Sequence, residues 1–150
     1  MAHSHTSTLY HVIYSTKHRQ PLLTPPILTR LIEFTGGLIR QSGGRMLAMG
    51  GSPDHVHVLA SLTPSAAISS QIREIKSLSS GWLKSSFPQL RAFAWQEGYS
   101  AVSVSQSVAG AVERYVRAQA EHHQTRTFEE ELVAILQKAG IEFDPRFVLD

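Results

Sequence analysis

The chain has 150 residues, of which 42% are hydrophobic and 17% charged, and this amount of apolar material predicts one compact domain spanning residues 1–150. It contains no cysteine, which excludes disulfides, thiolate metal sites and cysteine nucleophiles. With a net charge of only +2, a nucleic-acid partner would need locally clustered basic residues, and the lack of a long apolar run or a signal sequence predicts a cytoplasmic protein without a membrane span.

The first predicted element is a strand from Leu9 to Thr16, which follows a short polar arm and is rich in β-forming residues. Because side chains alternate along a strand, His11 and Ile13 lie on one face. Val12 lies on the other face, between Tyr10 and Tyr14. We assign these two tyrosines, like Tyr99 further on, to packing or to base stacking.

A helix is predicted next, with Thr24 as its N-cap and its end before Gly43. The Pro25-Pro26 pair suits the first turn of a helix, and glycine suits the residue after its end. Its buried face is marked by apolar residues at helical spacing, namely Ile27, Leu28, Leu31, Ile32, Phe34, Leu38 and Ile39.

A hairpin follows this helix. Its first strand is predicted from Arg45 to Gly50, and a turn follows through Asp54. The second strand is predicted in the segment Pro53-Asp54-His55-Val56-His57-Val58-Leu59. Residues two apart leave a strand on the same face, so His55 and His57 point away from the valines between and after them. Two adjacent imidazoles form half of a metal site; the alternative is a core or surface pair satisfied by hydrogen bonds.

The second helix is predicted from about Ala67 to Phe87. Arg73, Lys76 and Lys84 point outward and can contact phosphates, although a solvated helix face explains them as well. The inward residues are Ile68, Ile72, Ile75, Leu78, Trp82 and Leu83.

Residues Phe93 to Tyr99 and Ala101 to Ser105 are predicted as two short strands, or as one bent strand broken at Gly98. The resulting order β-α-β-β-α-β predicts an α+β, ferredoxin-like or RRM-like fold. Its antiparallel sheet would carry two helices on one face and leave the other face for a site.

A further helix is predicted from Ser107, its N-cap, to about His122. Tyr115 and Gln119 are four residues apart and therefore share one face of this helix. Such a pair is compatible with ordinary packing, but beside a separate histidine pair it would form a polar site.

Several segments together resemble the small single-tyrosine transposases of insertion sequences, the HUH class. The segments are Pro53–Leu59, Trp95–Tyr99, Ser103–Ser105, the pattern Tyr115-x-x-x-Gln119 with Glu121–His123 after it, and Phe128–Glu131. The opening Tyr10–Arg19 and the ending Ile141–Phe147 resemble this family as well. Ser100 and Val102 depart from it, where a glycine and an aromatic residue are usual.

This resemblance implies that His55, His57 and Gln119 bind one divalent metal ion and that Tyr115 is the nucleophile. Tyr115 would cleave single-stranded DNA at the hairpin ends of an insertion sequence and leave a 5′-phosphotyrosine link for rejoining. A phenol with a pKa near 10 needs an activated phosphodiester, which a bound cation supplies.

The metal is expected to be Mg²⁺ or Mn²⁺ by resemblance, although imidazole ligands suit transition ions better than magnesium. His122 and His123 are not included among the metal ligands. His123 could support a metal ligand or contact DNA, and either histidine could interact favourably with the dipole at the helix C-terminus. The DNA contacts expected are the basic side chains of the first turn and the second helix: Lys17, His18, Arg19, Arg73 and Lys76.

We expect a homodimer joined at a sheet edge, with the tyrosine helix serving either its own histidine pair or that of the other subunit. Two other functions stay open. A single-stranded nucleic-acid-binding module would stack bases on the sheet without catalysis or metal. A zinc hydrolase would need an acidic general base at motif spacing, which the sequence lacks.

Overall fold

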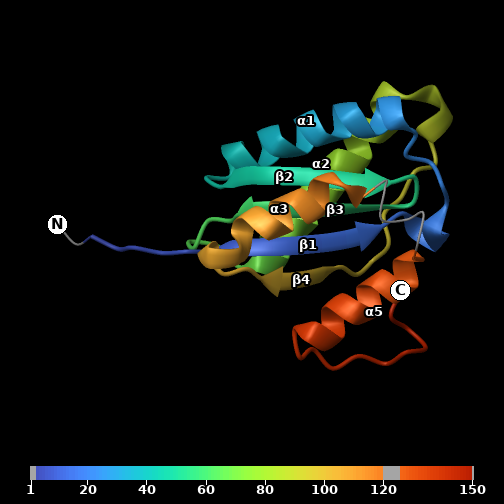
Figure 1. Cartoon of the computed structure of the whole chain (residues 1–150). Helices are drawn as coiled ribbons and strands as arrows, with labels where there is room; N and C mark the ends of the chain where they lie inside the picture. The colour runs from blue at the N-terminus through green and yellow to red at the C-terminus, as the bar shows by residue number, and fades with distance from the viewer. Residues whose placement is uncertain (1–2, 120–125, 150) are drawn as a thin grey trace.

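The computed structural model describes residues 3–119 and 126–149 (Figure 1). The predicted order β-α-β-β-α-β and the α+β class are confirmed, and within the described residues helices α3 and α5 follow the last strand. Three short 3-10 turns lie at Lys17–Arg19, Pro88–Leu90 and Gln106–Val108. The main elements are β1 (Leu9–Ser15), α1 (Pro25–Gln41), β2 (Arg45–Ser52), β3 (His55–Ser61), α2 (Ile68–Ser86), β4 (Ser100–Ser103), α3 (Ala109–Arg117) and α5 (Phe128–Lys138).

The four strands form one antiparallel sheet in the order β2-β3-β1-β4. The predicted hairpin of β2 and β3 is confirmed, with Ser52 opposite His55. On its other side β3 pairs with β1, so that Ile13 lies opposite His57. The strand with the two histidines is therefore central, and its pairing to both neighbours fixes which face each histidine occupies.

One face of the sheet carries the main hydrophobic core under α1 and α2 (Figure 1). Val12 and Tyr14 of β1 and Val56 and Val58 of β3 point into it, as their alternation predicts. From the helices, the same cluster receives the buried side chains of Leu31, Ile39, Ile72 and Leu83.

The other face of the sheet holds the histidine pair, as expected, and it is also covered by helices. Helix α3 crosses this face over β2 and β3, where Val116 packs on Ala48 and Leu59 (Figure 1). Helix α5 packs Phe128 and two leucines against Ile13 of β1. Apolar residues alternate with the histidines on this face, so it too has hydrophobic surface that must be covered.

The region before β4 differs from its prediction. Residues Phe93 to Tyr99 form no strand; Trp95 makes only an isolated bridge to Thr16, and β4 begins at Ser100. Both Phe93 and Trp95 are buried, and the Trp95 indole donates a hydrogen bond of 3.0 Å to Ser79 of α2. Burial of both aromatic rings in the core and this bond to α2 replace the sheet pairing expected here.

The tyrosine helix is also shorter than predicted. Helix α3 begins at Ala109, because Ser105 rather than Ser107 caps the chain and starts a 3-10 turn. It ends at Arg117, and the predicted end at His122 lies outside the described residues. None of the helices in the described ranges is both long and apolar enough to cross a bilayer.

Candidate active site

The two histidines of β3 are fully buried on the face beneath α3 and α5. Each ring has a partner at Nδ1: Asp54 Oδ1 lies 2.7 Å from His55 Nδ1, and His11 Nε2 lies 2.8 Å from His57 Nδ1. These contacts fix the orientation of both rings and direct both Nε2 atoms toward α5. Histidines that bind metals typically have their second ring nitrogen held in this way.

The Nε2 atoms of the pair face the carboxylate of Glu131. Glu131 Oε1 lies 2.9 Å from His57 Nε2 and 3.7 Å from His55 Nε2. One ligand atom from each of these three buried residues can be chosen so that all lie within 4.8 Å of one another. Glu131 belongs to the first turn of α5, whose N-cap Thr127 accepts a hydrogen bond from the Glu130 backbone N–H.

Tyr115 of α3 reaches the same carboxylate. Its hydroxyl donates a hydrogen bond to Oε2 of Glu131, and its ring centroid lies 6.0 Å from that of His57. The structure therefore brings the predicted nucleophile and the predicted histidine pair together within one chain, joined by Glu131.

Gln119 is fully buried just beyond the end of α3. Its Nε2 donates to the Tyr115 backbone carbonyl at 3.4 Å, so its amide lies on the side of Tyr115, as the spacing of four predicts. His122 and His123 lie outside the described residues.

The electrostatics of the site follow from burial and these hydrogen bonds. Burial raises the pKa of Tyr115, and the bond to Glu131 raises it further. Burial alone would raise the pKa of Glu131, but bonds from His55 and His57 outweigh it and hold this pKa well below its usual range. The phenol is therefore protonated and the carboxylate ionised near neutral pH.

The same balance acts on the histidines. Burial alone would lower the pKa of His55, but its hydrogen bond to Asp54 and the nearby carboxylate of Glu131 raise it. Burial lowers the pKa of His11 to about 3, and the neighbouring His57 adds to this effect. His11 is therefore neutral and can accept a hydrogen bond from His57.

Glu131 and His11 contact the histidine pair but were not predicted as site residues from the sequence. Glu131 is 74 positions from His57, and His11 is 46 positions away, so no local spacing connects them. Two weaker signals existed: Phe128–Glu131 is part of the family resemblance, and the alternation in β1 puts His11 on the face opposite Val12. Neither signal specifies a contact with the histidine pair.

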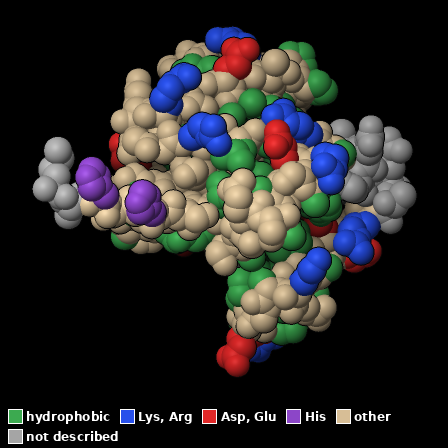
Figure 2. Space-filling view, turned by 60° about the vertical axis from the view of Figure 1, so that its left-hand side comes forward, with side chains coloured by type: hydrophobic (Ala, Val, Ile, Leu, Met, Phe, Trp, Pro, Cys, Tyr) green, Lys and Arg blue, Asp and Glu red, His purple; other side chains and the backbone are tan. Residues whose placement is uncertain are grey.

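The basic residues predicted to contact DNA are dispersed. The Lys17–Arg19 turn is exposed, with His18 and Arg19 in the left-handed backbone region at φ of 57° and 53°. Arg73 is exposed on α2. Figure 2 shows one face of the molecule, where Lys and Arg side chains are spread out with acidic side chains among them.

The prediction that Lys76 points outward is wrong. It is only 9% exposed, and its ammonium donates to the carbonyl oxygens of Gln96 at 2.7 Å and Gly98 at 2.6 Å. Burial lowers its pKa to about 8. The loop before β4 folds back over α2 and offers its carbonyl groups to this ammonium, an arrangement that helical spacing alone does not reveal.

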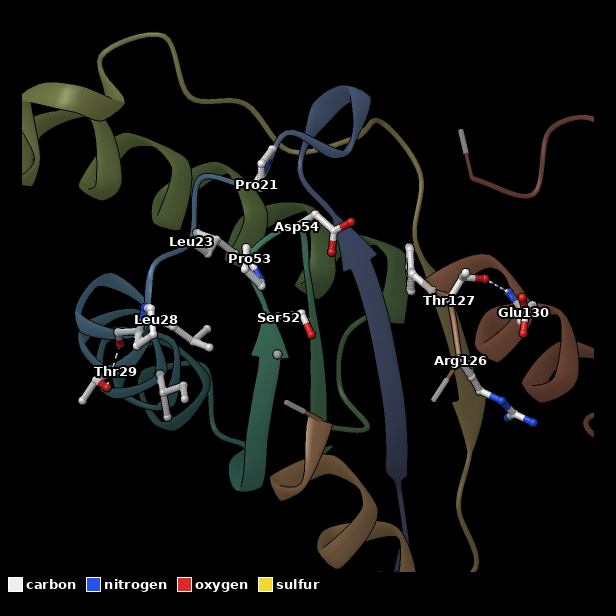
Figure 3. Close-up of a pocket in the computed structure, with 14 residues that line it drawn as sticks. Pro21, Leu23, Leu28, Thr29, Ser52, Pro53, Asp54, Arg126, Thr127 and Glu130 are labelled. Carbon is white, nitrogen blue, oxygen red and sulfur yellow. Dashed lines mark hydrogen bonds between the residues drawn. The ribbon is translucent and has the colours of Figure 1, made fainter. Parts of the chain in front are cut away.

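Two cavities flank the site. One, of about 840 Å³, lies between the start of α1, the β2–β3 turn and the start of α5. Figure 3 shows Leu28 and Thr29 on one side of it, Arg126 and Glu130 on the other, and Asp54 between. The second, of about 560 Å³, is lined by His11 and Tyr115 together with residues of β4 and α5. The residue that holds His55 and the tyrosine itself therefore each border a space of ligand size.

A family model and a curated relative both match most of this chain. The family model described as "Transposase IS200 like" matches residues 4–119. The ISDra2 transposase TnpA of Deinococcus radiodurans is 28% identical over 115 residues, which cover 73% of this chain and 82% of that protein. The segment matched by the family model ends at Gln119, so α5 lies beyond it.

Two solved structures share the fold. A Deinococcus radiodurans R1 crystal structure described as a transposase superposes with a TM-score of 0.64 and 25% identity, covering 77% of this chain and 95% of that one. A REP-associated tyrosine transposase bound to a REP hairpin gives a TM-score of 0.58 at 16% identity, covering 89% and 86%.

Proposed function

The chain belongs to the IS200-like transposase family, and we propose that it cleaves and rejoins single-stranded DNA at insertion-sequence ends, with Tyr115 as the nucleophile. The observation that carries this proposal is the hydrogen bond between Tyr115 and Glu131, because Glu131 also contacts His57. A phenol next to a buried histidine pair is the combination that phosphodiester transfer to tyrosine requires.

The reaction exchanges one phosphodiester for another. The phenol of Tyr115 loses its proton, its oxygen bonds to phosphorus, and the bond from phosphorus to the 3′ oxygen breaks. The departing oxygen takes up a proton, so the products are a 3′-hydroxyl and a 5′-phosphotyrosine. Because the new bond is also a phosphodiester, attack by another 3′-hydroxyl can reverse the step without an external energy source.

A divalent cation, Mg²⁺ or Mn²⁺, is part of this proposal, with His55 and His57 as ligands. Two imidazoles held at Nδ1 and directed by Nε2 toward an ionised carboxylate fit such an ion. When bound, the ion makes the phosphorus more electrophilic and stabilises charge on the phosphate oxygens. The family resemblance adds Gln119 as a ligand, and its amide lies beside Tyr115.

The DNA is proposed to reach Tyr115 through the cavity of about 560 Å³ that this residue lines. Affinity would come from exposed basic groups acting on phosphates, with Lys17, His18, Arg19 and Arg73 as candidates. The absence of cysteine fits a reducing compartment, so we place the reaction in the cytoplasm.

Two copies are proposed to form a homodimer through an edge strand. Strands β2 and β4 form the edges of the described sheet, and β2 is the longer, with eight residues. Within each copy we propose that Tyr115 acts with its own histidine pair, because its hydroxyl contacts Glu131 of the same chain. Mixing a Tyr115→Phe protein with a His55→Ala/His57→Ala protein should then give no cleavage; recovery in mixed dimers would show shared sites.

One gel tests the function. Labelled single-stranded and duplex DNA from the flanks of the gene is incubated with the protein, with and without Mg²⁺ or Mn²⁺, and resolved under denaturing conditions. We expect a covalent adduct only with single-stranded DNA and only with metal. Salt-sensitive binding with no adduct under any condition would favour the binding module instead.

A further inference from the structure

We infer that Glu131 of α5 is a protein ligand of the cation held by His55 and His57, and that its second oxygen positions Tyr115. This inference rests on the proposed function, because it concerns the same cation. It goes beyond that function by assigning a ligand outside the segment that the family model matches, residues 4–119.

The three ligand atoms are spaced closely enough to share one ion. Ligands about 2.1 Å from an octahedral ion lie about 3.0 Å apart when adjacent, and tetrahedral ligands of zinc lie about 3.4 Å apart. Glu131 Oε1 is 2.9 Å from His57 Nε2 and 3.7 Å from His55 Nε2. Both separations differ from these values by less than an ångström, and all three ligand atoms lie within 4.8 Å of one another, so modest side-chain adjustments bring them to one ion.

The chemistry of the three side chains also suits a cation. Glu131 is 0% exposed, and its carboxylate lies between two buried imidazoles. A buried anion is stable only when it is paired or coordinated to a metal. Two neutral nitrogens and one carboxylate oxygen suit Mn²⁺ and similar ions, and the negative charge attracts the cation more strongly than the neutral amide of Gln119 does.

Helix α5 is anchored on both sides of Glu131. The ring of Phe128 stacks on His55, with centroids 3.9 Å apart and planes at 16°. Phe128 and Leu132 pack against Ile13 of β1, next to the histidine strand. The carboxylate is therefore held over the pair by apolar packing and not by its own polar bonds alone.

The two oxygens of this carboxylate have different partners. Oε1 faces the histidine nitrogens, and Oε2 accepts the hydroxyl of Tyr115. A single side chain thus fixes the distance between the cation and the nucleophile. Glu131 acts on Tyr115 as a positioning residue, since the phenol attacks the phosphorus and the carboxylate only orients it.

The test measures Mn²⁺ binding to metal-free protein without DNA, by calorimetry and by the loss of the free-ion EPR signal. Glu131→Gln keeps the side-chain shape and removes the charge, and we expect at least about tenfold weaker binding. Glu129→Gln removes an exposed carboxylate from the same helical turn and should bind as the wild type does. His57→Ala should remove binding.

A second measurement uses the wild type alone, in case Glu131→Gln fails to fold. Protein labelled with ¹³C at glutamate carboxyl groups should show a ¹³C coupling to bound Mn²⁺ by electron-nuclear double resonance. Absence of this coupling, or wild-type affinity in folded Glu131→Gln, overturns the inference. If His57→Ala still loses Mn²⁺ in that case, the proposed histidine site stands; if the wild type binds no Mn²⁺ at all, the metal part of the proposed function fails as well.

Discussion

The two faces of the sheet are built from the same strands but hold different kinds of side chain. On the face under α1 and α2, Val12, Val56 and Val58 join one continuous hydrophobic cluster. On the face under α3 and α5, His11, His55 and His57 form a buried polar group with small apolar clusters on either side. A period of two residues thus separates the side chains that stabilise the fold from those that carry chemistry.

The helices that cover the two faces are attached differently. On the core face, α1 and α2 bury many large apolar side chains in one cluster. On the site face, α3 approaches β2 so closely that a Cβ on Gly50 would lie 2.0 Å from the Val116 carbonyl oxygen. The position of the tyrosine helix therefore depends on a glycine in the opposing strand.

Tyr115→Phe is expected to reduce the reaction far more than it reduces the stability of the protein. The change removes one hydroxyl, so the covalent adduct should fall by at least about 10³-fold while hairpin binding changes little. Stability should fall by no more than about 1–3 kcal/mol, because Glu131 loses the hydroxyl donor but keeps its contact with His57. The adduct is measured on denaturing gels and binding by a mobility shift. Tyr99→Phe, at a tyrosine with 38% of its surface exposed, is the matched control and should form the adduct normally. An adduct that persists in Tyr115→Phe would assign the nucleophile elsewhere.

Ile72→Ala on the core face is expected to lower the stability of the protein and to leave its Mn²⁺ affinity nearly unchanged. Ile72 is 1% exposed, and its truncation leaves a cavity that should lower the free energy of unfolding by about 2–5 kcal/mol. Urea unfolding gives the stability, and calorimetry below the melting temperature gives the Mn²⁺ affinity. A large loss of Mn²⁺ affinity in the folded variant would contradict the independence of the two faces.

A pair of glycine substitutions compares the helices directly. Gly50→Ala should displace α3, cost about 1–3 kcal/mol and reduce adduct formation, because the new methyl group meets the backbone of Val116. Gly81→Ala in α2 has no atom within 4 Å of the new group and should stabilise the protein by about 0.5–1 kcal/mol. Urea unfolding ranks the two variants; equal stability would show that α3 tolerates the shift.

A pH dependence compares one buried charged residue on each side of the sheet. Among the described lysines, arginines, aspartates and glutamates, only Lys76 and Glu131 are buried. Lys76 lies on the core side of the sheet and Glu131 on the site side. Burial lowers the pKa of Lys76 to about 8 from 10.5. Between these values the unfolded chain holds a proton that the folded chain has released, so stability should rise with pH.

This rise is expected to be on the order of 2 kcal/mol between pH 8 and pH 10.5. Urea unfolding at several pH values measures it in the wild type and in Lys76→Met, where it should disappear. Lys84→Met, at an exposed lysine of the same helix, is the control and should keep the rise. The same slope in all three proteins would mean that Lys76 titrates normally.

The sequence by itself determined the features that depend on local spacing. Alternation in β1 and β3 predicted which residues enter the core and placed His55 and His57 on one face. Proline, glycine and apolar periodicity predicted the element order and hence the antiparallel sheet. A spacing of four placed Gln119 on the side of Tyr115. Each prediction needs only the geometry of one element, which a short stretch of sequence specifies.

Only the tertiary structure decided the contacts between residues that lie far apart in the sequence. Glu131 reaches His57 across 74 positions because α5 packs on Ile13, and no periodicity encodes that contact. Lys76 lies at an outward helical position and is nevertheless buried by the loop before β4. Alternation likewise could not reveal that two helices cover the site face. Such contacts depend on how complete elements pack, so they become visible only when the whole chain is folded.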